Sequence, residues 1–117
     1  MGDYDAAVNQ YQLAIELNPK FVSARMNMGN ALFRQEKYEE AIEIYLQVQK
    51  LRPDSALTYY NLGVAYFKQN QWARAEKEWK RALALKPNYS QAQRGLNDVR
   101  KKKPFSQGSK VLSSRTR

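Results

Sequence analysis

The chain has 117 residues, of which 43% are hydrophobic, and a formal net charge of +9 at pH 7. This length allows at most one domain with a modest core. Because the sequence contains no Cys and no His, it has no disulfides, no thiolate metal sites and none of the commonest general base. The charge is uneven: residues 1–93 carry +2 and residues 94–117 carry +7, which is typical of a basic tail behind a nearly neutral body.

The start of the chain shows no targeting signal that we recognise. Residues 1–5 are acidic and lack the apolar stretch of a signal peptide. Ala6 stands where a myristoylation signal requires Ser or Thr. No apolar run approaches the roughly 20 residues that cross a membrane. We therefore expect no membrane partner.

Apolar or small residues recur at spacings of three and four along much of the chain, which predicts helices. In chain order, these segments are residues 22–35, 56–69 and 72–85. Pro19, Pro53 and Pro87 are expected to end helices, because Pro cannot continue one.

The sequence repeats at a fixed interval, which is the step from Pro19 to Pro53 and again from Pro53 to Pro87. Residues 61–79 are identical to residues 27–45 at six of nineteen positions, and four of the differences are conservative: Met28 and Leu62, Arg34 and Lys68, Tyr38 and Trp72, Tyr45 and Trp79. Four further sets of equivalent residues keep the same interval: Ala7, Ala41 and Ala75; Tyr11, Tyr45 and Trp79; Tyr4, Tyr38 and Trp72; Leu17, Leu51 and Leu85. A fixed interval of this length indicates stacked supersecondary units, here pairs of helices.

Two glycines fall in the middle of predicted helices. Gly costs about 1 kcal/mol relative to Ala in a helix interior. Gly29 and Gly63 therefore predict that a neighbouring helix approaches closely, with Tyr45 and Trp79 as the large side chains that enter the space. Ala41 and Ala75 would be the small residues facing them.

These residues resemble the tetratricopeptide repeat family. Residues 56–89 match its pattern through Tyr59, Leu62, Gly63, Tyr66, Ala75, Trp79, Ala82 and Pro87. Residues 22–55 match through Met28, Gly29, Leu32, Ala41, Tyr45, Val48 and Pro53, with Arg25 in place of the first aromatic residue. The resemblance implies an all-α fold, a right-handed superhelical stack of antiparallel helix pairs (an α-solenoid).

The resemblance also implies a domain organisation. A repeat domain at 1–103 would hold a half repeat (2–21), two full repeats (22–55 and 56–89) and a capping helix (90–103), followed by a basic tail (104–117). The capping helix is polar on its outer side, at residues 100–103, as a solvent-facing cap should be. The tail contains Phe105, Val111 and Leu112; we expect it to be dispensable for folding, with those three residues as its possible anchors.

The helix at 3–17 would be the second helix of a pair without its first. Val8, Tyr11 and Ile15 would then lack part of their cover. We therefore expect one of three situations: a C-terminal piece of a longer repeat protein, self-association through this helix, or a short protein that tolerates the exposed edge.

No residue set indicates catalysis. The carboxylates Glu39, Glu40, Glu43, Glu76 and Glu78 are interleaved with Lys and Arg, which predicts solvated helix faces. The five glycines form no phosphate-binding loop. We expect no enzymatic activity, no cofactor and no metal.

In the family, the first helix of each pair lines a concave face. The resemblance therefore implies a partner-binding surface for a peptide or protein at Met26, Asn27, Asn30, Phe33, Arg34, Leu57, Tyr60, Asn61, Val64, Phe67, Lys68, Arg94 and Lys101, with Gln91 and Asp98 beside them. The equivalent residues Asn27 and Asn61 would either hold the backbone of an extended peptide or satisfy local polar groups. Phe33 and Phe67 would either contact the ligand or pack against the stack.

A known subclass grips the C-terminal tails of heat-shock chaperones through five polar residues. This sequence supplies two of them, Asn30 and Asn61. It has Met26, Gln91 and Gly95 at the positions where that subclass has cations. The sequence therefore disfavours a chaperone tail as the partner.

The sequence leaves two other functions open. The basic end from Arg94 to Arg117 would bind nucleic acid or an acidic surface, and a steep salt dependence would reveal it. The aromatic residues argue against this alternative, because they fall at core positions rather than between basic ones. In the other alternative, the chain is a targeting or regulatory segment of a larger enzyme.

Overall fold

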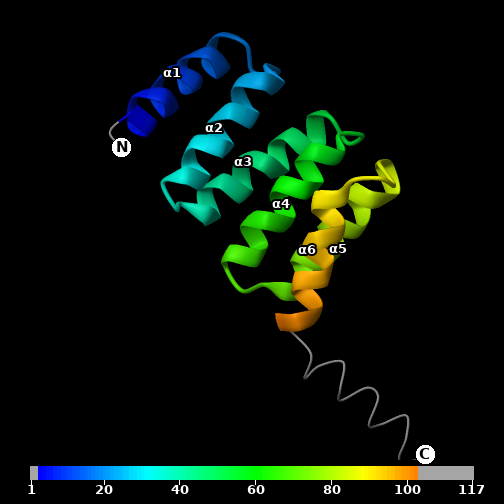
Figure 1. The fold of residues 1–117 in the computed structure, drawn as a ribbon. Coiled ribbons are helices and arrows are strands. Elements are labelled where there is room, and N and C mark those ends of the chain that lie inside the picture. Colours follow the sequence, from blue (N-terminus) through cyan, green and yellow to red (C-terminus); the bar gives the residue numbers. More distant parts are fainter. Residues whose placement is uncertain (1–2, 103–117) are drawn as a thin grey trace, which may run out of the picture.

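The computed structural model describes residues 3–102, and these residues form six helices with no strand among them. The helices are α1 (Asp3–Leu17), α2 (Val22–Arg34), α3 (Tyr38–Leu51), α4 (Ala56–Lys68), α5 (Trp72–Leu85) and α6 (Ser90–Lys102). Each helix packs against the next in the chain, and α4 also contacts α6 (Figure 1). The expected all-α solenoid is confirmed. The basic tail at 104–117 and the last residue of the expected cap, Lys103, lie outside the described residues.

The helix boundaries follow from two local rules. The helices α1, α3 and α5 each end two residues before a proline, since the residue preceding Pro disfavours the helical conformation. The turns inside the two pairs α2–α3 and α4–α5 contain Glu36 and Asn70, which are equivalent in the repeat and have φ of 64° and 62°. In the second turn, the Gln71 N–H donates to the Tyr66 carbonyl oxygen at 2.9 Å, which closes the helix end as in a Schellman motif.

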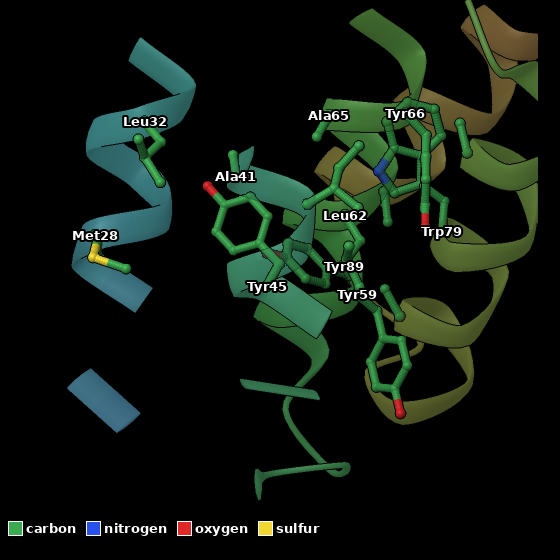
Figure 2. Packing of buried hydrophobic residues seen from close by; sticks show 14 of the residues in the cluster. Met28, Leu32, Ala41, Tyr45, Tyr59, Leu62, Ala65, Tyr66, Trp79 and Tyr89 are labelled. Atoms are coloured by element: carbon green, nitrogen blue, oxygen red, sulfur yellow. The ribbon is translucent and has the colours of Figure 1, made fainter. Parts of the chain in front are cut away.

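The two mid-helix glycines mark close helix contacts, as expected from the sequence. A Cβ atom at Gly29 would lie 2.6 Å from Cε1 of Tyr45, and one at Gly63 would lie 2.4 Å from Nε1 of Trp79. Ala41 and Ala75 are fully buried beside them. Figure 2 shows Tyr45 pointing towards the helix that carries Met28 and Leu32. The repeat therefore interlocks by placing one large ring against one glycine in each pair.

Arg25 takes over the role of an aromatic residue. In the second full repeat, the hydroxyl of Tyr59 donates to the carbonyl oxygen of Pro53 at 2.7 Å. In the first, the Arg25 guanidinium Nε donates to the carbonyl oxygen of Pro19 at 3.0 Å. Both donors reach back to the same proline position. The departure from the family pattern therefore preserves the hydrogen bond that ties a first helix to the preceding turn.

The burial of the apolar side chains of α1 differs in part from the expectation. Val8 and Tyr11 are half-buried, but Ile15 is only 8% exposed and belongs to the core. Ile15 is buried because α1 packs against α2, so the side of α1 that carries Ile15 is closed. Leu13 and Leu17, on the rest of the helix surface, are exposed.

One carboxylate was wrongly expected to be solvated. Glu39, Glu40 and Glu43 are exposed, but Glu78 is 7% exposed. Its carboxylate faces α3, from which Gln49 Nε2 donates to it at 3.4 Å. Burial raises the pKa of Glu78, although Arg81 and Lys77 partly oppose this effect.

The raised pKa of Glu78 predicts a pH-dependent cost. The folded protein holds a proton that the unfolded chain has lost, so stability should fall as pH rises from the ordinary Glu pKa through the raised folded value. Glu78→Gln should therefore increase the free energy of unfolding at pH 7 and match the wild type well below the ordinary Glu pKa. Urea denaturation at several pH values measures both. Glu43→Gln is the exposed control; a wild type more stable than Glu78→Gln at pH 7 would show that the neighbouring cations dominate.

Candidate partner-binding groove

The inner helices α2, α4 and α6 enclose two adjoining hollows. The first, of about 490 Å³, lies between α2 and α4; the second, of about 540 Å³, lies between α4 and α6. Tyr60 and Val64 line both hollows, which therefore form one continuous groove. The residues that line it are Asn30, Phe33, Arg34, Tyr45, Leu57, Tyr60, Asn61, Val64, Phe67, Lys68, Trp79, Gln91, Arg94, Gly95, Asn97, Asp98 and Lys101.

The residues expected at a partner surface fall into two places. All of them line the groove except Met26 and Asn27, which line a separate hollow of about 380 Å³. The groove also contains Tyr45 and Trp79, which sequence reasoning assigned to the core alone. Both come from second helices, and their rings reach the groove floor because glycines on the first helices leave room.

An ordered pair of amides lies in the first hollow. The Tyr45 hydroxyl donates to Asn30 Oδ1 at 2.6 Å, and Asn61 Nδ2 lies 3.5 Å from the same oxygen and 3.4 Å from Met26 Sδ. Burial raises the pKa of Tyr45 to about 12, so its hydroxyl remains protonated and serves as a donor. These contacts leave the N–H groups of Asn30 and the carbonyl oxygen of Asn61 for a ligand.

The two asparagines that share a repeat position do not share an environment. Asn61 is half-buried between two inner helices, whereas Asn27 is exposed. The difference arises because Asn61 faces α2, and no described helix occupies the corresponding place beside Asn27. An amide row through Asn30 and Asn61 therefore fits the groove better than one through Asn27 and Asn61.

Apolar groups form the middle of the groove. Phe33 and Phe67 are half-buried, and each packs edge-on against an aromatic residue of the following helix: Tyr38 at 5.2 Å and Trp72 at 4.9 Å between ring centroids. Both phenylalanines thus pack within the stack and still line the groove. Leu57 is 49% exposed although it is a large apolar side chain.

Positive charge predominates among the ionisable side chains in the groove. Arg34, Lys68, Arg94 and Lys101 are exposed there, against the single carboxylate of Asp98. The groove therefore combines apolar surface, free amide groups and excess positive charge.

Comparison with family models identifies the repeat. A model described as "TPR repeat" matches residues 1–36 and 29–70, and a model described as "Tetratricopeptide repeat" matches residues 56–89. The chain belongs to the tetratricopeptide repeat (TPR) family. TPR domains are generally non-catalytic interaction modules, and membership supports a role for this chain as a protein-interaction scaffold. No curated protein sequence matched it significantly.

Solved TPR structures share this fold. The first TPR of Spaghetti (RPAP3), bound to the HSP90 peptide SRMEEVD, superimposes with a TM-score of 0.82 at 26% identity, over 86% of this chain and 79% of that one. The first TPR domain of human RPAP3 gives 0.84 at 25% identity, over 92% and 85%. The MamA structure gives 0.81 at 29% identity over 86% of this chain, which spans 58% of MamA. Within residues 3–102, no helix is long and apolar enough to cross a membrane.

The TPR pattern is interrupted at Gly95, and the structure shows why. Gly95 occupies the repeat position of Asn61, one interval further along the chain. A Cβ atom there would lie 2.7 Å from three ring atoms of Trp79. In the preceding repeat the equivalent ring is the smaller Tyr45, which leaves space for Asn61. The larger indole therefore leaves no room for a side chain at this position of α6 unless the ring or the helix shifts.

Proposed function

We propose that this TPR domain is a non-catalytic module whose groove holds an extended segment of a partner protein. The continuity of the groove across α2, α4 and α6 carries the proposal. Packed helices lie about 8–10 Å apart, so three of them span roughly 16–20 Å between axes. An extended chain advances about 3.3 Å per residue, and five or six residues would fill that length.

Each part of the groove matches one part of such a segment. The N–H groups of Asn30 and the carbonyl oxygen of Asn61 would pair with a peptide carbonyl and a peptide N–H. Leu57, Tyr60 and Val64 would cover an apolar side chain of the partner, and the exposure of Leu57 beside the other two supports this. The module acts by holding its partner and requires no chemical step.

The partner is proposed to differ from the chaperone tail bound by the Spaghetti domain. At the positions that the family resemblance assigns to that grip, Asn30 and Asn61 are present. Met26, Gln91 and Gly95 supply no cation. The Trp79 indole also excludes a side chain at Gly95.

Selection from a library of random linear peptides tests the proposal. Peptides selected on the wild-type chain should bind the Leu57→Glu variant at least tenfold more weakly, because the change removes apolar contact and introduces a charge in the groove. Leu85→Glu is a matched control, since Leu85 is 45% exposed, lies at the end of α5 and does not line the groove. Fluorescence anisotropy gives both dissociation constants.

Either of two results would contradict the proposal. One is equal affinity of the selected peptides for the wild type and for Leu57→Glu. The other is a loss in Leu85→Glu as large as that in Leu57→Glu, because the peptides would then be responding to a general change in the protein.

A further inference from the structure

Three cations occupy the same position in successive repeats. Arg34 is the last residue of α2, Lys68 the last of α4 and Lys102 the last described residue of α6, and each follows the previous one by one repeat interval. All three side chains are exposed. We call this set the basic row. It lies at the same end of each inner helix, because equivalent residues of stacked repeats lie in register.

Two members of the basic row line the groove, and the third lies beside a residue that contacts it. Arg34 lines the first hollow and Lys68 lines the second. Lys102 Nζ lies 6.0 Å from the ring centroid of Trp72, and Trp72 packs against Phe67, which lines the groove. Lys101 and Arg94 add positive charge at the α6 end.

Within the described part of the chain, no ion pair satisfies these three cations. The salt bridge there joins Lys80 to Glu76 on α5, at 3.4 Å. A cation at a helix C-terminus stabilises the helix through the helix dipole, but any position in the last turn would serve that purpose. The dipole does not require the same position three times beside a groove.

We propose that the partner segment is acidic and that its carboxylates recur at about every third residue, pairing with Arg34, Lys68 and Lys102. This inference rests on the proposed function, because it names the ligand class of the same groove. Directly packed helices are about 8–10 Å apart, which is the smallest separation that neighbouring inner helices can have, and three extended residues advance about 10 Å. The chain's own residues 104–117 contain Lys110, Arg115 and Arg117 and no acidic side chain, so they lack the charge that the row requires.

Three synthetic peptides of equal length test the spacing. The first carries Glu at every third position among Leu and Ser, the second carries the same residues with the Glu clustered, and the third carries Gln instead of Glu. By fluorescence anisotropy at low salt, the first should bind the wild type roughly tenfold more tightly than either of the others.

Two triple variants locate the effect. Arg34→Gln, Lys68→Gln and Lys102→Gln together should weaken binding of the spaced peptide by roughly tenfold or more. The control variant has the same net charge: Lys20→Gln, Lys50→Gln and Lys77→Gln remove three exposed cations that do not line the groove. It should keep most of the affinity. Circular dichroism melting curves establish that both variants are folded.

Any one of three outcomes would contradict the proposed pairing of the basic row with spaced carboxylates. The first is equal binding of the spaced and clustered peptides, the second is equal losses of affinity in the two triple variants, and the third is no binding of the spaced peptide to the wild type. A further outcome is that the Gln peptide binds as tightly as the spaced one, with Leu57→Glu binding neither peptide. In that case the proposal about the basic row is wrong, while the proposed function stands.

Discussion

Trp79→Ala is expected to lower the free energy of unfolding by about 3–5 kcal/mol, the range for removing a buried Trp side chain. Trp79 is 3% exposed and joins three helices. It lies on α5 and contacts Gly63 of α4 and Gly95 of α6, and its Nε1 donates to the Tyr60 carbonyl oxygen at 3.1 Å. Its loss would leave a cavity at the junction of the last three helices and remove the indole hydrogen bond to the Tyr60 carbonyl oxygen.

Chemical denaturation measures this change, and the other tryptophan provides the control. Trp72 is half-buried and packs chiefly on Phe67, so Trp72→Ala should cost clearly less. Equal losses for the two substitutions would contradict the central position assigned to Trp79.

Gly63→Ala and Gly95→Ala are each expected to destabilise the fold by about 1–3 kcal/mol through overpacking. In an open helix, the same substitution would gain about 1 kcal/mol from helix propensity. Overpacking should dominate, because a Cβ at Gly63 would lie 2.4 Å from the indole and a Cβ at Gly95 would lie 2.7 Å from it. The ring has little freedom to withdraw, since moving from one glycine brings it against the other.

A double-mutant cycle tests the glycine argument without relying on absolute stabilities. In the Trp79→Ala background the space is open, so Gly63→Ala should become neutral or stabilising. Denaturation midpoints of the wild type, both single variants and the double variant complete the cycle. A glycine substitution that remains equally destabilising without the indole would show that another contact is responsible.

The repeat made most of the fold predictable. The fixed repeat interval determines which residues are equivalent, so Gly29 with Tyr45 and Gly63 with Trp79 could be recognised as close contacts before any coordinates. The resemblance to the family, in which first helices line the concave face, supplied most of the groove residues. Met26 and Asn27 are the exceptions, because they line a separate hollow.

The unpredicted features are those that depend on contacts between repeats. Glu78 resembles its exposed neighbours in sequence, but it is buried and its carboxylate accepts from Gln49 of the preceding repeat. Asn61 and Asn27 occupy one repeat position, yet only Asn61 has an inner helix to face. Arg25 departs from the pattern in residue type and keeps the hydrogen bond. The repeat interval predicts which residues are equivalent, but it does not predict which neighbouring helix each of them contacts.

The aromatic ring on the second helix of each pair, Tyr45 or Trp79, packs in the core and also shapes the groove. Tyr45 leaves room for Asn61 and orients Asn30 through its hydroxyl, which gives the first hollow its amide pair. Trp79 is larger and leaves no room for an amide at Gly95, the repeat position of Asn61. The two halves of the groove therefore differ: the first holds the paired amides of Asn30 and Asn61, and the second holds most of the charged side chains, Lys68, Arg94, Asp98 and Lys101.

Amide chemical-shift mapping with a library-selected peptide measures most directly whether the groove is the binding surface. On titrating the peptide into ¹⁵N-labelled protein, the proposed function predicts the largest shifts at Asn30, Tyr60, Asn61 and Val64, along α2 and α4. Residues of the outer helices such as Glu43 and Lys77 should change little. Large shifts confined to α1, α3 or α5, with the inner helices unchanged, would contradict binding in the groove.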